Sequence, residues 1–203
     1  MKEPLFLASN SPRRAKLLTQ LGFEFTVCSP QNQEMYLKQG SDDEIVKLAN
    51  ENALQKALSV LPTIEQGIIL SGDTLVVTDD NMVLGKPKSP EEALSMLQKL
   101  VGRTHRVISA VAVVEVTKKK TRQGHVWAKV TFQHASEQAL NEYVLTREPL
   151  GKAGGYAIQG KGAFLVKEIE GSYTSVIGLP VELVLSLLSE FGITPHSNSS
   201  SRI

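Results

Sequence analysis

The sequence predicts an α/β fold built on a mixed β-sheet, and three observations support this prediction. Short apolar runs alternate with helical patterns through the first half of the chain, as in α/β proteins. Longer β-rich runs at 106–116 and 125–132 then dominate the second half. Ser-x-x-Glu sequences beginning at Ser41 and Ser89 each precede an apolar periodic run, and this capping-box pattern predicts where two helices begin.

The elements of the first half follow from the apolar runs and the residues that flank them. Ser11 is a predicted N-cap, with Pro12 at the first helical position and Gly22 as the stop of that helix. The helix that begins at Ser41 carries a largely apolar face. In order, we expect a strand at 5–8, a helix at 12–21, a strand at 23–27, a loop at 29–40, a helix at 42–60, a strand at 68–70 that ends at 72–73, extended residues at 75–77, a turn at 79–81 and a hairpin strand at 82–84.

The second half is expected to continue with strands and three further helices. The basic cluster at 118–122 is typical of a solvated hairpin tip, because charged turns between strands face water. We treat residues 1–195 as a single domain. In order, we expect a helix at 90–101 that Gly102 ends, strands at 106–116 and 125–132, a helix at 136–145, a flexible glycine-rich loop at 151–155, a strand at 163–169, a helix at 180–191 and a disordered tail at 196–203.

Composition excludes several classes of function. The chain has 203 residues and a net charge of +1, with 22 Lys and Arg against 21 Asp and Glu, so it lacks the basic surplus of a protein that binds nucleic acid or an anionic membrane. Any recognition of phosphate must therefore be local. Cys28 is the only cysteine, no signal peptide is evident, and no apolar run approaches the ~20 residues needed to span a bilayer. We expect a cytoplasmic protein.

The segment from Ser9 to Arg14 is a candidate anion site. A strand ends there and a helix begins with Arg13 and Arg14 in its first turn, where the helix dipole disfavours positive charge. A bound phosphate would remove that cost, because free backbone N–H groups, the hydroxyls of Ser9 and Ser11 and both guanidinium groups would surround it. The alternative is that both arginines are solvated or pair with an acid such as Glu34.

Three further charged residues are candidates for the same chemistry. Asp73 follows an apolar strand, and a carboxylate at the mouth of a strand can hold Mg²⁺ or activate water. The alternative is that Asp73 only caps a turn. Lys86 precedes Pro87 and is either a projecting site lysine or an ordinary exposed one. Lys56 interrupts the apolar helix face, where it either snorkels to water or meets an anion.

The glycine-rich segment 151–160 is a candidate for nucleotide recognition. Its glycines allow the backbone to approach a ligand closely, and the amide of Gln159 could face the edge of a base. The alternative is a glycine-rich hairpin with a surface amide. The sequence contains no Walker A motif, and no G-x-G-x-x-G follows a strand.

Together, seven motifs in order over residues 5–192 identify a family resemblance. The chain resembles the Maf family of nucleotide pyrophosphatases. The matching motifs are Leu7-Ala8-Ser9-Asn10-Ser11-Pro12-Arg13-Arg14, Gly72-Asp73-Thr74, Gly85-Lys86-Pro87, Gly102-Arg103-Thr104-His105, Lys152-Ala153-Gly154-Gly155-Tyr156-Ala157-Ile158-Gln159-Gly160, Gly171-Ser172-Tyr173 and Gly178-Leu179-Pro180.

The resemblance implies a fold, a reaction and a set of roles. The fold is an elongated mixed β-sheet flanked by helices, with two lobes around a cleft, as also found in inosine triphosphate pyrophosphatases. The reaction is cleavage of a nucleoside triphosphate to the monophosphate and pyrophosphate, assisted by Mg²⁺ or Mn²⁺. Asp73 matches the proton acceptor and, with Glu34, a metal ligand. The remaining implied roles are phosphate binding by Ser9, Ser11, Arg13, Arg14, Lys56 and Lys86, and substrate choice by Arg13, Thr74 and Gln159.

Two departures from the family pattern affect these roles. The family has a Lys-Ala pair at the position of Asn52, and we interpret Lys56-Ala57 as that pair, displaced by one helical turn, with little role for Asn52. Gly151 replaces an Asp that usually precedes Lys152, which leaves the orientation of Lys152 open. At three positions, Arg13, Thr74 and Gln159 resemble the residues of the family branch that acts on dTTP and UTP. The branch that acts on 7-methyl-GTP has Trp, Gln and Glu at these positions.

Two alternatives to a dTTP and UTP pyrophosphatase remain open from the sequence. One is a house-cleaning enzyme that cleaves ITP or XTP, and the other is a non-catalytic nucleotide-binding regulator of septum formation. As partners we expect a nucleoside triphosphate, no nucleic acid and no membrane, and we leave a homodimer open.

Overall fold

The structure, a computed structural model, describes residues 3–195. Its strands are β1 (Leu5–Ala8), β2 (Thr26–Cys28), β3 (Ile68–Val77), β4 (Val83–Leu84), β5 (Thr104–Glu115), β6 (Thr121–Phe132) and β7 (Val166–Gly171). They form one seven-stranded sheet in the order β2-β1-β3-β5-β6-β7, with β4 paired to β3. β1 is parallel to β2 and β3, and every other pairing is antiparallel, so the predicted mixed sheet is confirmed.

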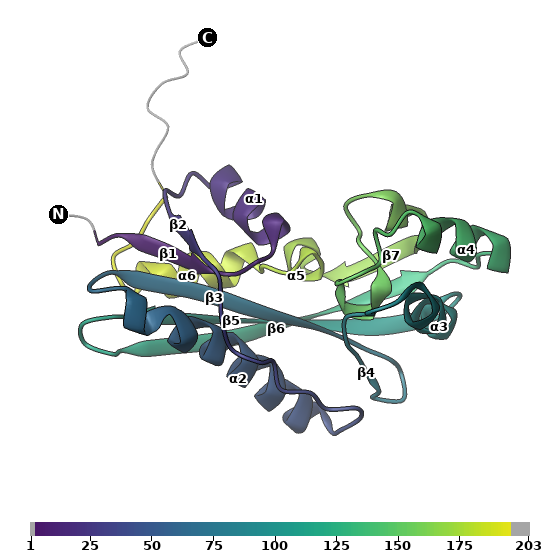
Figure 1. The fold of residues 1–203 in the computed structure, drawn as a ribbon, viewed down its shortest axis with the longest axis horizontal. Coiled ribbons are helices and arrows are strands. Elements are labelled where there is room, and N and C mark those ends of the chain that lie inside the picture. Colours follow the sequence, from purple (N-terminus) through teal and green to yellow (C-terminus); the bar gives the residue numbers. More distant parts are fainter. Residues whose placement is uncertain (1–2, 196–203) are drawn as a thin grey trace, which may run out of the picture.

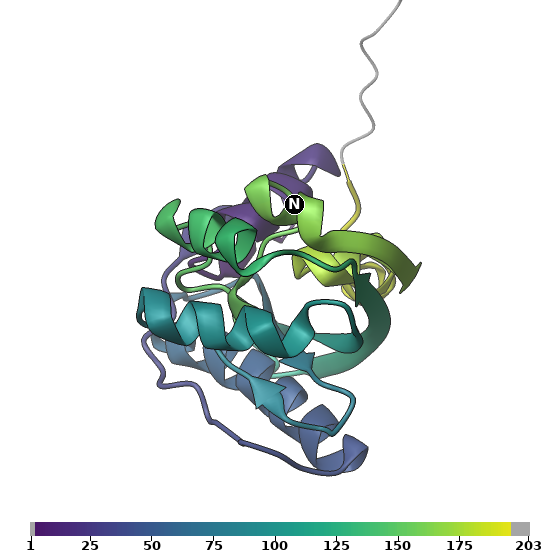
Figure 2. The ribbon, with the colours of Figure 1, turned by 90° about the vertical axis from the view of Figure 1, so that its right-hand side faces the viewer.

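Helices flank this sheet on both faces (Figures 1 and 2). They are α1 (Pro12–Gln20), α2 (Asp42–Val60), α3 (Pro90–Leu100), α4 (Glu137–Leu145), α5 (Tyr173–Ile177) and α6 (Val181–Ser189), with short 3₁₀ turns η1 (Leu61–Thr63), η2 (Ala153–Gly155) and η3 (Lys161–Leu165). No helix among residues 3–195 is long and apolar enough to cross a membrane. The tail expected at 196–203 lies outside the described residues.

Local sequence signals fix most helix ends. Ser41 and Glu44 form the complete capping box, since each side chain accepts the other residue's backbone N–H. At α3 the predicted box is only half formed: Ser89 accepts from the N–H of Glu92, but the Glu92 carboxylate accepts from Lys88. α1 begins at Pro12, as expected.

The structure corrects four sequence predictions. The second strand is 26–28 rather than 23–27, and the first three residues of the strand expected at 163–169 belong to η3 instead. The strand expected to end at 72–73 runs on to Val77. The glycine-rich loop expected to be flexible is folded into η2, where the Gly154 N–H donates to the Gly85 carbonyl. Position 154 requires glycine for two reasons. The φ of Gly154 is +67°, and a Cβ at this position would lie 2.9 Å from the side chain of Val76.

Two clusters of apolar side chains occupy opposite ends of one face of the elongated sheet (Figure 1). At one end α1 and α6 pack on β1, β3 and β5, and at the other α3 and α4 pack on β5 and β6. The opposite face is covered by α2. Helices from both ends of the molecule therefore flank the space between the two clusters.

The edge of β3 has a gap that positions the site. β1 pairs with β3 as far as Ser71, and β4 pairs with the same edge from Val76, while β5 occupies the other edge throughout. Residues 72–75 therefore have no strand neighbour on that edge among the described residues. Successive side chains of a strand point to opposite faces. Asp73 accordingly faces α2, and Thr74 faces the side of α1 and α5.

Candidate active site

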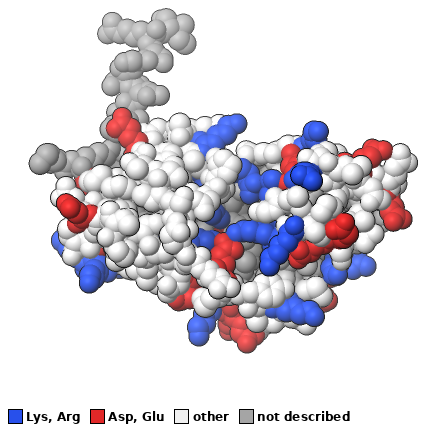
Figure 3. Space-filling model, in the orientation of Figure 1, with Lys and Arg blue, Asp and Glu red and all other residues white. Residues whose placement is uncertain are grey.

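A cavity of about 580 Å³ opens at the gap in β3. Figure 3 shows it as a hollow between the two ends of the molecule, with Lys and Arg atoms on its walls. Its charged lining residues are Arg13, Arg14, Lys56, Lys86, Lys152, Glu34 and Asp73. Five cationic groups against two carboxylates make the cavity a site for an anion, although the chain as a whole is nearly neutral. The cationic groups are thus concentrated locally, where the sequence predicts an anion site.

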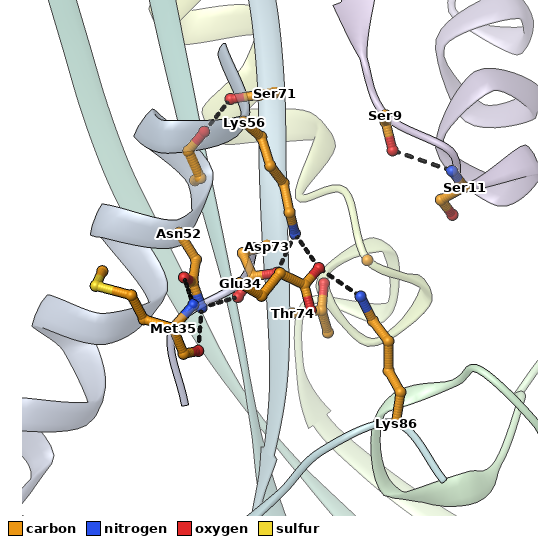
Figure 4. A network of polar contacts seen from close by, with 12 residues as sticks. Ser9, Ser11, Glu34, Met35, Asn52, Lys56, Ser71, Asp73, Thr74 and Lys86 are labelled. Carbon is orange, nitrogen blue, oxygen red and sulfur yellow. Dashed lines mark hydrogen bonds and ion pairs between the residues drawn. The ribbon is translucent and has the colours of Figure 1, made fainter. Parts of the chain in front are cut away.

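Asp73 lies at the centre of this lining and is 2% exposed. Its Oδ1 is 2.5 Å from the Nζ of Lys56, and its Oδ2 accepts from the amide of Asn52 at 3.2 Å (Figure 4). Contrary to the sequence prediction, Asp73 does not follow the end of a strand. It reaches the cavity from within β3 because the neighbouring strand β1 stops two residues earlier in the register.

Glu34 joins Asp73 through a shared lysine. The Nζ of Lys56 lies 2.7 Å from Glu34 Oε1, and the Nζ of Lys86 lies 2.5 Å from the same oxygen. Partial burial raises the pKa of the Glu34 carboxyl, but the charges and hydrogen bonds of Lys56 and Lys86 outweigh it and lower this pKa to about 2. The polar loop that follows β2 is thereby drawn against α2 and the β4 side of the cavity.

The α-helical period brings Asn52 and Lys56 to the same face of α2, one turn apart. Both side chains contact Asp73, Lys56 through its ammonium group and Asn52 through its amide nitrogen. Lys56 is the site lysine, as the spacing to Asp73 predicts, because it alone of the two lines the cavity. Sequence reasoning did not anticipate the contact between Asn52 and Asp73.

Arg14 is buried at 8% exposure and binds protein acceptors on three sides. It donates to the carbonyl of Gly178 at 2.7 Å, to Thr74 Oγ1 at 3.0 Å and to Ser9 Oγ at 3.3 Å. Burial lowers the pKa of this guanidinium below its ordinary value, although the negative charge of Asp73 acts in the opposite direction. Arg14 therefore connects β1, β3 and the end of α5, and only its remaining N–H groups are open to a ligand.

The other N-terminal residues also lie where the sequence predicts. Ser9 and Ser11 line the cavity, and Ser9 Oγ accepts from the backbone N–H of Ser11. Arg13 lines it too, and its Nε donates to the carbonyl of Ile177 at 3.4 Å. Thr74 Oγ1 is 2.8 Å from Ser109 Oγ. The segment that was predicted as an anion site is thus assembled at the mouth of the cavity.

Gln159 is the one predicted residue that the structure does not bring to the others. It is exposed and is absent from the lining, which in that segment consists of Tyr156, Ala157 and Ile158. Lys152 does line the cavity despite the glycine that precedes it, and its Nζ donates to the carbonyl of Glu148. Burial, with the charge of Arg13, lowers the pKa of Lys152.

Asn32 is a lining residue that sequence reasoning missed. Its amide nitrogen and oxygen are shielded from solvent and have no hydrogen-bond partner among residues 3–195. Unpaired buried amides are unfavourable, so this group is a candidate ligand contact. An asparagine in a polar loop carries no periodic or motif signal that could have revealed it.

The carboxylates of Glu34 and Asp73 fit one type of metal site. Among the described residues no group of three or more His, Cys, Asp or Glu side chains could hold an ion. Mg²⁺ in nucleotide enzymes is commonly held by one or two carboxylates together with waters and substrate phosphates. The donor set therefore fits a divalent cation that arrives with a triphosphate, rather than one bound by protein alone.

Comparisons with known proteins agree on one family. A family model described as Maf-like protein matches residues 4–191. A dTTP/UTP pyrophosphatase of Dictyoglomus turgidum is 43% identical over 193 residues, which cover 95% of this chain and 98% of that protein. A Bacillus cytotoxicus protein of the same name is 43% identical over 91% of this chain and 94% of its own length. One from Nitratidesulfovibrio vulgaris is 44% identical over 93% and 88%.

Proposed function

Since the chain belongs to the Maf-like protein family, we propose that it hydrolyses dTTP and UTP to the monophosphate and pyrophosphate. The observation that carries this proposal is the cationic cavity with Asp73 at its centre. The proposed reaction is hydrolysis of a phosphoric anhydride, for which the lining offers the Asp73 carboxylate as a base.

Asp73 is the proton acceptor in this mechanism. A water oxygen attacks the α-phosphorus, its proton passes to the Asp73 carboxylate, and the bond from the α-phosphorus to the bridging oxygen breaks to release pyrophosphate. Lys56 and Asn52 hold the two carboxylate oxygens in place. Lys86, Lys152 and Arg13 bind the phosphate oxygens and stabilise the charge that the leaving pyrophosphate gains.

Glu34 and Asp73 are the residues that would hold Mg²⁺ or Mn²⁺. When bound, the cation neutralises charge on the triphosphate. Lys56 contacts both carboxylates and Lys86 contacts Glu34, so two ammonium groups of this chain balance the two carboxylates in the absence of substrate.

A substrate panel tests the proposal. Purified protein is incubated with dTTP, UTP, CTP, ITP, XTP and 7-methyl-GTP in Mg²⁺ or Mn²⁺, and pyrophosphate release is measured. We expect kcat/KM for dTTP and UTP to exceed that for CTP strongly, since a site that buries a mismatched polar group discriminates well. Cleavage of ITP with none of dTTP or UTP would favour the house-cleaning alternative. Nucleotide affinity without pyrophosphate release would favour a regulator of septum formation.

The setting of the enzyme is part of the same proposal. A single cysteine suits a reducing compartment, and we place the protein in the cytoplasm. Fluorescence imaging of the tagged full chain, together with cell fractionation, tests this placement. Light scattering tests the homodimer that the sequence leaves open.

A further inference from the structure

The side chain of Asn52 uses both N–H groups and its oxygen in contacts that meet at the active site. It is 1% exposed. Its Oδ1 accepts from the Met35 N–H at 2.8 Å, and its Nδ2 donates to the Met35 carbonyl at 3.1 Å and to Asp73 Oδ2 at 3.2 Å (Figure 4). An asparagine amide has two donors and one acceptor oxygen, and here each of them has a protein partner.

These contacts join two residues that the proposed mechanism requires. Met35 directly follows Glu34, so the paired bonds to its N–H and carbonyl fix the backbone beside the Glu34 carboxylate. The same amide nitrogen holds Asp73. Because the segment between β2 and α2 contains no helix or strand, its position depends on such side-chain contacts.

Asn52 does not itself line the cavity, whereas Lys56, one turn later on α2, does. Any effect of Asn52 on turnover therefore has to pass through Asp73 and Glu34 and not through contact with the nucleotide. We infer that Asn52 is a positioning residue, which sets the orientation of Asp73 and its spacing from Glu34. This inference rests on the proposed function.

The chemistry of the side chain explains why other residues of similar size cannot replace it. Leucine would fill the volume but leave the Met35 N–H and carbonyl without partners. Aspartate would keep an acceptor for the Met35 N–H, yet it would lose both donors and set a second carboxylate against Asp73. A short carboxamide alone supplies the acceptor and both donors at this distance.

Asn52→Leu is the main test, with Asn50→Leu as a matched control on the same helix. Within residues 3–195, Asn50 forms no hydrogen bond with Asp73 or Met35, and its backbone carbonyl accepts from the Gln123 amide. Hydrogen bonds to charged groups are strong enough that we expect Asn52→Leu to lower kcat for dTTP about 10- to 100-fold. Its KM should stay within about threefold, and Asn50→Leu should stay within about twofold in both constants.

A double-mutant cycle separates positioning from a general structural role. If Asn52 acts through Asp73, adding Asn52→Leu to Asp73→Asn should produce little further loss, because the base it positions is already absent. A structural defect would instead multiply the two losses. Asn52→Ala, which removes the amide and adds neither charge nor bulk beside Asp73, is the second variant should Asn52→Leu fail to fold, and it is expected to fold and to lower kcat.

The outcomes distinguish this inference from the proposed function. A wild-type protein that releases no pyrophosphate overturns both. A wild-type protein that is active, with Asn52→Leu within threefold of its kcat, overturns the positioning role alone. Three other results would also overturn the positioning role. They are a loss in kcat that persists in full in the Asp73→Asn background, a KM that rises as much as kcat falls, and failure of both Asn52 variants to fold.

Discussion

Replacing Lys56 by methionine tests the central charge arrangement of the site. The substitution keeps most of the aliphatic stem and removes the ammonium group that lies 2.5 Å from Asp73 and 2.7 Å from Glu34. The side chains of Lys56 and Asp73 are only 8% and 3% exposed, so solvent cannot replace the lost charge. Removing one partner of a buried pair typically destabilises a protein by about 3–5 kcal/mol.

We expect the lower end of that range, about 3 kcal/mol, because two cations remain nearby. Lys86 still contacts Glu34, and the charge of Arg14 still acts on Asp73. Lys86→Met is the matched control. Lys86 is 46% exposed and contacts only the partly exposed Glu34, so its loss should change stability by about 1 kcal/mol or less.

Urea unfolding followed by circular dichroism at pH 7 measures both variants, and pyrophosphate release measures turnover. We expect Lys56→Met to lose about 100-fold or more in kcat/KM, which corresponds to nearly 3 kcal/mol of transition-state stabilisation. The reasoning is refuted if Lys56→Met is as stable as Lys86→Met, or if it retains near-normal turnover.

Three other predictions concern the base, the nucleotide preference and acid stability. Asp73→Asn should remain folded, since Lys56 keeps its contact with Glu34, and lose about 10²–10⁴-fold in kcat; near-normal turnover would remove Asp73 from the mechanism. Gln159 is exposed and lies outside the cavity lining, so Gln159→Glu should leave the ratio of kcat/KM for UTP to that for CTP unchanged, and a smaller ratio would show that Gln159 reads the base. Burial lowers the pKa of His105 from 6.5 to about 4. The unfolded chain therefore binds the extra proton first, and stability should fall by about 3 kcal/mol between pH 6.5 and 4. In urea unfolding, His105→Gln should lose less over that interval, and an equal loss would contradict the assignment.

Local signals in the sequence were sufficient for most of the fold. The capping residue Ser41, the N1 proline of α1 and the β-rich runs each predicted an element that the structure contains. The prediction of a strand at 163–169 was partly wrong, because a residue distant in the sequence determines the backbone conformation there. The Glu148 carboxylate accepts from the N–H groups of Lys161 and Gly162, which favours a 3₁₀ turn over a strand there.

The site was predictable where a motif or a helical period placed its residues. Ser9, Arg13, Lys56, Asp73 and Lys86 converge on one cavity, as the combined motifs predict. The role of Asn52 was missed, because its partner is the backbone of a loop whose position no periodicity specifies.

The position of Asn32 and the exposure of Gln159 were unpredictable for the same reason. Both residues lie outside helices and strands, and tertiary contacts alone determine which way their side chains point.

The bond between Arg14 and the carbonyl of Gly178 has a consequence for how the protein is made. The two residues are 164 positions apart in the sequence, yet the Arg14 Nε lies 2.7 Å from the Gly178 carbonyl oxygen. At about 5–20 residues per second, a ribosome needs roughly 10–30 s to synthesise the chain between them. During that interval the Arg14 guanidinium lacks one of its three acceptors, so the nascent protein cannot complete its binding cavity. Chains whose synthesis stops before Gly178 therefore lack this part of the cavity lining.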